Sequence, residues 1–400
     1  MIPFDLFDSF DRFDSIFASM NIGFDAKRAY HNGTGLGHYS RNLINSLSEF
    51  FPQHQYYLFN PKPSSVFKIR GNNVHEVLPS GINKLFSAAW RSSWVKNDLK
   101  KYKIDLYHGL SHEIPFGIQQ TGIRSVVTIH DLIHERFPEQ YNPIDIKIYN
   151  KKFRYSCKHA DKIIAVSEQT KTDIIDFYKM PAEKISVCYQ ACNPEFGKLV
   201  SDDEKKRIRV LYDLPEQFFL YVGSVIERKN LLNICKAFFL LRKEMNIPLV
   251  VIGDGGKYKQ QVKDYILQNG IKDRIIFLSE NPSAKSTESF KSAIDFPAIY
   301  QSAIAMIYPS FFEGFGIPVL EALWSRLPVI TSNVSCLPEV GGSAAFYVNP
   351  SNVEEIAEAM RKIYIDKAIA RDMIEKGWQQ AQNFSAEKCA TAVMKVYNEL

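Results

Sequence analysis

The chain has 400 residues, 46% of them hydrophobic and 23% charged, and its formal net charge is +5. This length favours two domains, and the composition is ordinary for a soluble globular enzyme. The charge is consistent with anionic ligands or a membrane surface, and we expect no nucleic-acid partner. No uncharged stretch reaches the roughly 20 residues of a membrane-spanning helix. We therefore expect a cytoplasmic protein and leave open a peripheral contact with the inner face of the membrane.

Residues 1–19 differ from the rest of the chain, because FDLFDSFDRFDSIF repeats a Phe-Asp unit. The segment lacks the basic start and cleavage site of a signal peptide. Three interpretations remain open for this segment: a leader upstream of the natural start, a packed appendage helix, and a helix that binds a membrane or a partner. Met20 then opens MNIGFDAKR, which is typical of a first strand.

From residue 20 onward, short apolar segments alternate with helical patterns, as in the predicted helices at 38–50 and 144–159. This alternation is typical of a parallel sheet with helices on both faces. Strands of a first sheet are predicted at 21–25, 55–59, 106–108, 125–130 and 162–166.

The alternation restarts after CYQACNPEF, with further strands at 218–222, 249–252, 274–278, 303–308 and 328–331. The predicted fold class is α/β, with two Rossmann-like, doubly wound parallel-sheet domains that face each other across a cleft. Ligands of such sheets bind at the carboxyl ends of the strands. We assign residues 20–195 to an acceptor-binding domain and 196–380 to a nucleotide-sugar-binding domain. Residues 381–400 form a last helix, with a return to the first domain left open.

Residues 32–40, NGTGLGHYS, follow the first predicted strand and open a helix. Gly35 and Gly37 let the backbone approach a ligand closely, and a helix N-terminus favours negative charge. We therefore name both as donor-binding candidates. Their spacing is not the dinucleotide-binding fingerprint, and an ordinary turn explains these glycines equally well.

Residues 221–231, YVGSVIERKNL, repeat this arrangement in the second half. A strand ends at Gly223, and Arg228 and Lys229 follow at the turn into a helix. Adjacent cations beside free N–H groups suit a diphosphate better than they suit a solvated surface pair. Gly223, Arg228 and Lys229 are therefore donor-binding candidates.

His130 and Asp131 lie in VVTIHDL, just past a strand of the first domain. A histidine there can orient a sugar hydroxyl, although a structural histidine at the strand end is the alternative. Ser167 begins SEQTKTDI and is expected to cap a helix, with a ligand role less favoured.

Glu313 and Glu321 lie eight residues apart in YPSFFEGFGIPVLEAL. Glu313 falls in the loop after a strand, and Glu321 about one turn into the helix that Pro318 begins. The backbone N–H groups of Gly314, Phe315 and Gly316 would be free to meet a ligand. Two carboxylates at two depths can accept hydrogen bonds from both ends of a sugar nucleotide.

In this order, these motifs resemble the retaining glycosyltransferases of family GT4, which have the GT-B fold. The resemblance covers residues 20–400 and includes the E-x7-E pair, GSVIERKNL, TIHDL, the loop at 32–39 and residues 328–350. It departs at Ser224, where many members carry arginine, and in the long segment after Phe277.

The resemblance implies a role for each matched position. Glu313 contacts the transferred hexose, and His130 lies beside the reacting sugar. Glu321 holds the ribose, and Arg228 and Lys229 neutralise the diphosphate. The backbone of residues 314–316 binds the sugar.

The predicted function is transfer of a hexose from a nucleotide diphosphate sugar to a saccharide or lipid-linked saccharide, in cell-surface polysaccharide synthesis. Residues 328–350 most resemble mannosyltransferases, so GDP-mannose is favoured over UDP-sugars. No Asp-x-Asp motif is evident, and the six cysteines have no metal-ligand spacing. We therefore expect neither metal nor cofactor, and reduced thiols. The alternatives are a non-catalytic sugar-nucleotide or glycan-binding protein, a GT-B epimerase and a phosphorylase.

Overall fold

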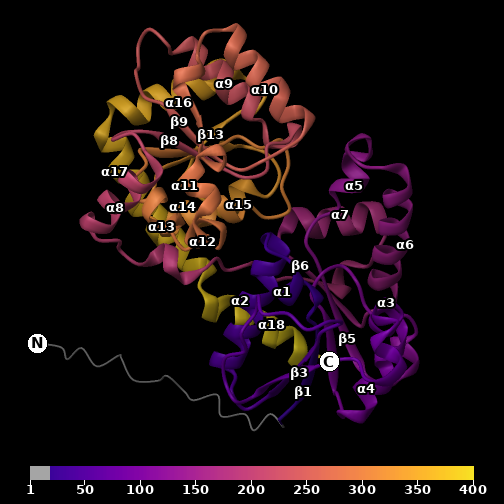
Figure 1. Ribbon diagram of the computed structural model, residues 1–400. Helices are drawn as coiled ribbons and strands as arrows, with labels where there is room; N and C mark the ends of the chain where they lie inside the picture. The colour runs from indigo at the N-terminus through magenta and orange to yellow at the C-terminus, as the bar shows by residue number, and fades with distance from the viewer. Residues whose placement is uncertain (1–18) are drawn as a thin grey trace, which may run out of the picture.

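The computed structural model describes residues 19–400 and contains two parallel sheets, one in each half of the chain (Figure 1). The first sheet has seven strands in the order β3-β2-β1-β4-β5-β6-β7, and the order reverses beside β1, as in doubly wound folds. Its strands are β1 Asn21–Asp25, β2 Gln55–Phe59, β3 Val74–Val77, β4 Leu106–Gly109, β5 Arg124–Ile129, β6 Lys162–Ala165 and β7 Ile185–Val187.

Four of the six connections between these strands contain α-helices, while the β2–β3 connection has none and the β4–β5 connection has only a 3-10 turn, Ile118–Gln120. The helices are α1 Lys27–His31, α2 Gly35–Phe50, α3 Ser87–Ala89, α4 Val95–Lys101, α5 Ile133–Arg136, α6 Pro143–His159 and α7 Glu168–Tyr178. A short π-helical turn, η2 Trp90–Trp94, separates α3 from α4.

The second sheet has six strands in the order β10-β9-β8-β11-β12-β13. They are β8 Phe219–Val222, β9 Leu249–Ile252, β10 Ile275–Phe277, β11 Ala305–Tyr308, β12 Val329–Ser332 and β13 Phe346–Val348. The helices of this half are α8 Asp202–Tyr212, α9 Leu231–Leu240, α10 Lys257–Gln268, α11 Pro282–Ser286, α12 Glu288–Lys291, α13 Phe296–Tyr300, α14 Ile317–Trp324, α15 Leu337–Gly341, α16 Val353–Ile365 and α17 Lys367–Ala381.

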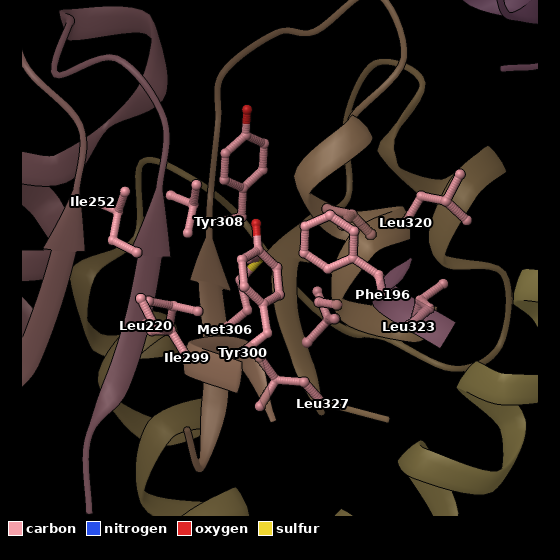
Figure 2. Packing of buried hydrophobic residues seen from close by; sticks show 14 of the residues in the cluster. Phe196, Leu220, Ile252, Ile299, Tyr300, Met306, Tyr308, Leu320, Leu323 and Leu327 are labelled. Atoms are coloured by element: carbon pink, nitrogen blue, oxygen red, sulfur yellow. The ribbon is translucent and has the colours of Figure 1, made fainter. Parts of the chain in front are cut away.

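The central strands β8, β9, β11 and β12 are fully buried because helices cover both faces of the sheet. Figure 2 shows one of these faces, where Leu220 and Met306 on the strands pack with Tyr300, Leu320 and Leu323 from the covering helices. This packing fixes α14 against β11, and the loop between them therefore has a defined position.

The last helix, α18 Ala386–Asn398, lies against α2 of the first domain, as its yellow ribbon among the indigo elements shows in Figure 1. The hydroxyl of Tyr397 is 2.6 Å from Nδ1 of His108, on β4. The chain thus crosses between the domains twice, once after β7 and once before α18. The two crossings are in contact, since the rings of Tyr189 and Phe384 lie 5.3 Å apart.

The predicted fold class is confirmed, with differences at the ends of strands and at the sheet edges. Strands β3, β7 and β13 were not predicted, and all three are edge strands with a single neighbour. The predicted strand at 274–278 is shorter, because Arg274 and Leu278 lie in flanking 3-10 turns. All six cysteines are buried and unpaired. Except for residue 19, the predicted leader lies outside the described residues.

None of the helices in residues 19–400 combines the length and apolar character of a membrane-spanning segment.

Candidate functional site

Glu313 lies in the loop between β11 and α14, and four side chains contact its carboxylate. Oε2 is 3.0 Å from the Arg228 guanidinium, and Oε1 is 3.4 Å from the Lys229 ammonium. The hydroxyls of Tyr308 and Ser310 donate to Oε1 at 2.9 and 2.7 Å. Burial raises the pKa of Glu313, but the two cations and the two hydroxyls outweigh burial and lower the pKa to about 2. Glu313 is therefore an ionised, oriented hydrogen-bond acceptor.

Arg228 and Lys229 follow β8 in the 3-10 turn η7 Glu227–Lys229, which leads into α9. Gly223 directly follows β8 and has φ +150°, and a Cβ there would lie 3.2 Å from the Lys229 side chain. The Lys229 ammonium is 2.5 Å from the Tyr308 hydroxyl, and Arg228 also donates to the Phe312 carbonyl. Burial lowers the pKa of Lys229, and Glu313 opposes that effect. Two cations against one carboxylate leave positive charge for an anionic ligand.

Glu321 lies on α14, with Pro318 in the first turn of that helix, as predicted. The Tyr300 hydroxyl donates to its Oε2 at 2.8 Å. Burial raises the pKa of Glu321 to about 7, although Tyr300 and Lys229 oppose the shift. The two glutamates therefore differ in charge near neutral pH, and Glu321 titrates in the physiological range.

The glycine loop, residues 313–316, faces the first domain. A Cβ at Gly314 would lie 2.1 Å from the His130 carbonyl oxygen, so no other residue fits this approach. Gly316 caps α14 with φ +108°, a conformation that favours glycine. In the part of the chain that the structure describes, the N–H groups of residues 314–316 have no protein acceptor. They are available to a ligand.

His130 lies just past β5, at the carboxyl edge of the first sheet, with its side chain buried. Its Nε2 donates to the Leu110 carbonyl at 2.9 Å, which leaves Nδ1 as the acceptor nitrogen. Burial lowers the pKa of His130 to about 4. The imidazole is therefore neutral at physiological pH.

Gly35 and Gly37 lie in the first turn of α2. The Asn32 side chain accepts from the N–H groups of Thr34 at 2.7 Å and Gly37 at 3.3 Å. A Cβ at Gly37 would lie 1.9 Å from the Asn32 carbonyl oxygen, which gives this glycine a packing role. A contact of Gly35 and Gly37 with the donor stays a prediction.

The structure thus brings together three of the predicted site residues, because the Arg228 and Lys229 side chains both contact the Glu313 carboxylate. Sequence reasoning missed Tyr308, Ser310 and Tyr300. Tyr308 and Ser310 stand in the same YPSFFEGFG stretch, and hydroxyls beside a buried acid were the available signal. Ser167 caps α7 as expected, and its Oγ accepts from the Thr170 N–H.

Among residues 19–400, no three His, Cys, Asp or Glu side chains lie close enough together to hold a metal ion.

Comparison with protein families matches residues 33–196 to "Glycosyltransferase Family 4" and residues 202–380 to "Glycosyl transferases group 1". O-antigen chain mannosyltransferase B of Escherichia coli is 31% identical over 78% of this chain and 77% of its own length. O-antigen chain mannosyltransferase RfbU of Salmonella typhimurium is 28% identical over 69% of this chain and 72% of its own length.

Solved structures share the fold over nearly the whole chain. A glycosyltransferase from Rickettsia africae superposes with a TM-score of 0.72 at 19% identity, covering 96% of this chain and 99% of the other. The HepE protein of Anabaena, in complex with UDP and glucose, gives a TM-score of 0.70 at 16% identity and covers 95% and 100%.

Proposed function

Because this chain belongs to glycosyltransferase family 4 and has the GT-B fold, we propose that it transfers a hexose, with retention, from a nucleotide diphosphate sugar to an acceptor hydroxyl. The observation that carries this proposal is the ionised Glu313 carboxylate held between Arg228 and Lys229 at the carboxyl edge of the second sheet. A fixed acceptor beside two cations suits a sugar hydroxyl next to a phosphate.

In the proposed reaction, the bond from the anomeric carbon to the phosphate oxygen breaks as the acceptor oxygen attacks the same face. Negative charge grows on the departing diphosphate, which Arg228 and Lys229 stabilise without metal. The departing phosphate oxygen takes the acceptor proton. Glu313 accepts a hydrogen bond from the hexose, and the neutral His130 lies beside the reacting sugar. No cofactor is required.

We assign the remaining donor contacts in this proposal from where each residue lies relative to Glu313, Arg228 and Lys229. Glu321 accepts hydrogen bonds from the ribose, and the free N–H groups of residues 314–316 bind the hexose or its phosphate. Gly223 gives Lys229 room beside the diphosphate, and Gly35 and Gly37 allow close approach from the first domain.

The proposed donor is GDP-mannose. The relatives named above are O-antigen mannosyltransferases, which supports both mannose and a role in cell-surface polysaccharide synthesis. UDP-sugars are the rival donors, since HepE was solved with UDP and glucose. The proposed acceptor is a saccharide, free or lipid-linked.

A peripheral membrane contact is also part of the proposal, supported by an apolar surface segment between β3 and α4. Four large side chains are exposed there: Ile82 at 68%, Leu85 at 80%, Phe86 at 52% and Trp94 at 42%. Lys84 lies among them and is exposed as well. Apolar side chains with a cation beside them suit an anionic lipid surface.

The test is incubation with GDP-mannose and with a panel of UDP-sugars, with a saccharide acceptor. NMR of the product gives the sugar and the anomeric configuration. Formation of an α-linked product from an α-linked donor, without consumption of inorganic phosphate, is expected. An inverted product, or no transfer from any nucleotide sugar, contradicts the proposal.

A further inference from the structure

The glycine loop is held through its carbonyl groups by side chains from outside the loop. Ser335 Oγ donates to the Glu313 carbonyl at 2.7 Å. Cys336 Sγ lies 3.1 Å from that oxygen and 3.0 Å from the Phe315 carbonyl oxygen. The Gly314 carbonyl, between these two, accepts from Ser167 Oγ at 2.7 Å. Side chains thus bind three consecutive carbonyls of the loop.

Because a trans peptide is planar, a carbonyl and the N–H of the next residue point in opposite directions. No peptide bond in the described residues is cis. The donors that hold the carbonyls of residues 313–315 therefore aim the N–H groups of residues 314–316 away from those donors. Among residues 19–400, these N–H groups have no protein acceptor.

Ser167 differs from Ser335 and Cys336 because it belongs to the first domain. It is fully buried at the N-terminus of α7, where its Oγ accepts from the Thr170 N–H at 3.0 Å. Two acceptors lie within reach of its single proton, and the Gly314 carbonyl at 2.7 Å is nearer than the Thr170 hydroxyl at 3.0 Å. The Thr170 hydroxyl also reaches the Gly314 carbonyl, at the longer distance of 3.3 Å. The two oxygens of Glu339, on α15, accept from the N–H groups of Glu168 and Gln169 at 2.8 and 3.0 Å. The N-terminus of α7 is thus hydrogen-bonded both to the glycine loop and to α15 of the second domain.

We propose that Ser167 is a positioning residue for the transfer reaction: from the first domain, it sets the peptide plane between Gly314 and Phe315, and so aims the Phe315 N–H at the donor. This proposal rests on the proposed function. It means that the donor site of the second domain is complete only while the first domain is seated on the glycine loop.

The kinetic test compares Ser167→Ala with Ser201→Ala. Ser201 caps α8, which also has 11 residues, by the same bond, but it touches no residue of the glycine loop. Ser167→Ala is expected to lower kcat roughly tenfold with acceptor KM unchanged. Ser201→Ala is expected to leave kinetics alone. Ser167→Gly, which keeps much of the capping preference, is expected to show the same loss of kcat.

Equal kcat in wild type, Ser167→Ala and Ser167→Gly overturns the proposal. Amide hydrogen exchange of residues 311–320 separates this outcome from failure of the proposed function. Faster exchange there in Ser167→Ala than in wild type, without nucleotide, supports the positioning role even if no donor is turned over. Equal exchange contradicts it.

Discussion

Replacing Glu321 by glutamine removes one ionisation while leaving an oxygen that can accept from Tyr300, which lies 2.8 Å from Oε2. The folded-state pKa of Glu321 is about 7, above the ordinary value of 4.5, because burial favours the neutral acid. The stability that this neutral acid contributes is fully present below about pH 4.5. It is lost as the pH rises through 7, because ionisation then has to occur in the fold.

The difference between the two pKa values corresponds to about 3 kcal/mol at about 1.4 kcal/mol per unit. As the pH rises from 4.5 to 8.5, the free energy of unfolding of Glu321→Gln should therefore increase by about 3 kcal/mol relative to that of wild type. For a domain of this size, that is a relative rise in Tm of roughly 6–12 °C. Thermal unfolding of both proteins across this range is the assay.

Glu375→Gln is the matched control, because Glu375 is exposed on α17 and forms no ion pair among the described residues. Its Tm should differ from that of wild type by the same amount at every pH. A Tm difference for Glu321→Gln that is equally flat would refute the reasoning, since the carboxyl would then titrate as it does in water.

Four further predictions concern the site and the surface. Lys229→Ala should lower turnover about 100-fold and also lower Tm, because it leaves a buried Glu313 with one cation fewer; adding Glu313→Gln should restore Tm but not turnover. Glu313→Gln should mainly lower kcat and Glu321→Gln should mainly raise donor KM, by roughly 10- to 100-fold, and unchanged steady-state kinetics in both would defeat the site assignment. Activity should survive excess EDTA, and a loss that Mg²⁺ or Mn²⁺ reverses would reveal a required metal. The double variant Leu85→Ser and Phe86→Ser should bind anionic vesicles less than wild type in a flotation assay, with unchanged transfer to a soluble acceptor.

The buried central strands were predictable from the sequence, whereas three of the four edge strands, β3, β7 and β13, were not. Strand β9, LVVI, is buried on both faces and is therefore a continuous apolar run. Strand β3, VHEV, has one neighbour and carries two polar residues, while β7 and β13 have three residues each. An edge strand needs less burial than a central one, so its sequence carries less of the pattern.

The same limit applies to the site. The clustering of Arg228, Lys229 and Glu313 was predictable because each follows a strand, and strand ends meet at one edge of the sheet. The contact of Ser167 with Gly314 joins residues 147 positions apart and depends on how the two domains face each other. No pattern among neighbouring residues of the sequence could therefore predict this contact.

The double crossing of the chain restricts how the two domains can turn against each other. A single linker would allow one domain to rotate about any axis relative to the other. Two linkers that lie side by side restrict this rotation to one axis, which passes through both of them. The Phe315 ring lies 6.0 Å from Tyr189 on one crossing and 5.7 Å from Phe384 on the other. Because points near an axis move least, a rotation about these crossings would displace Phe315 less than residues that lie farther from them.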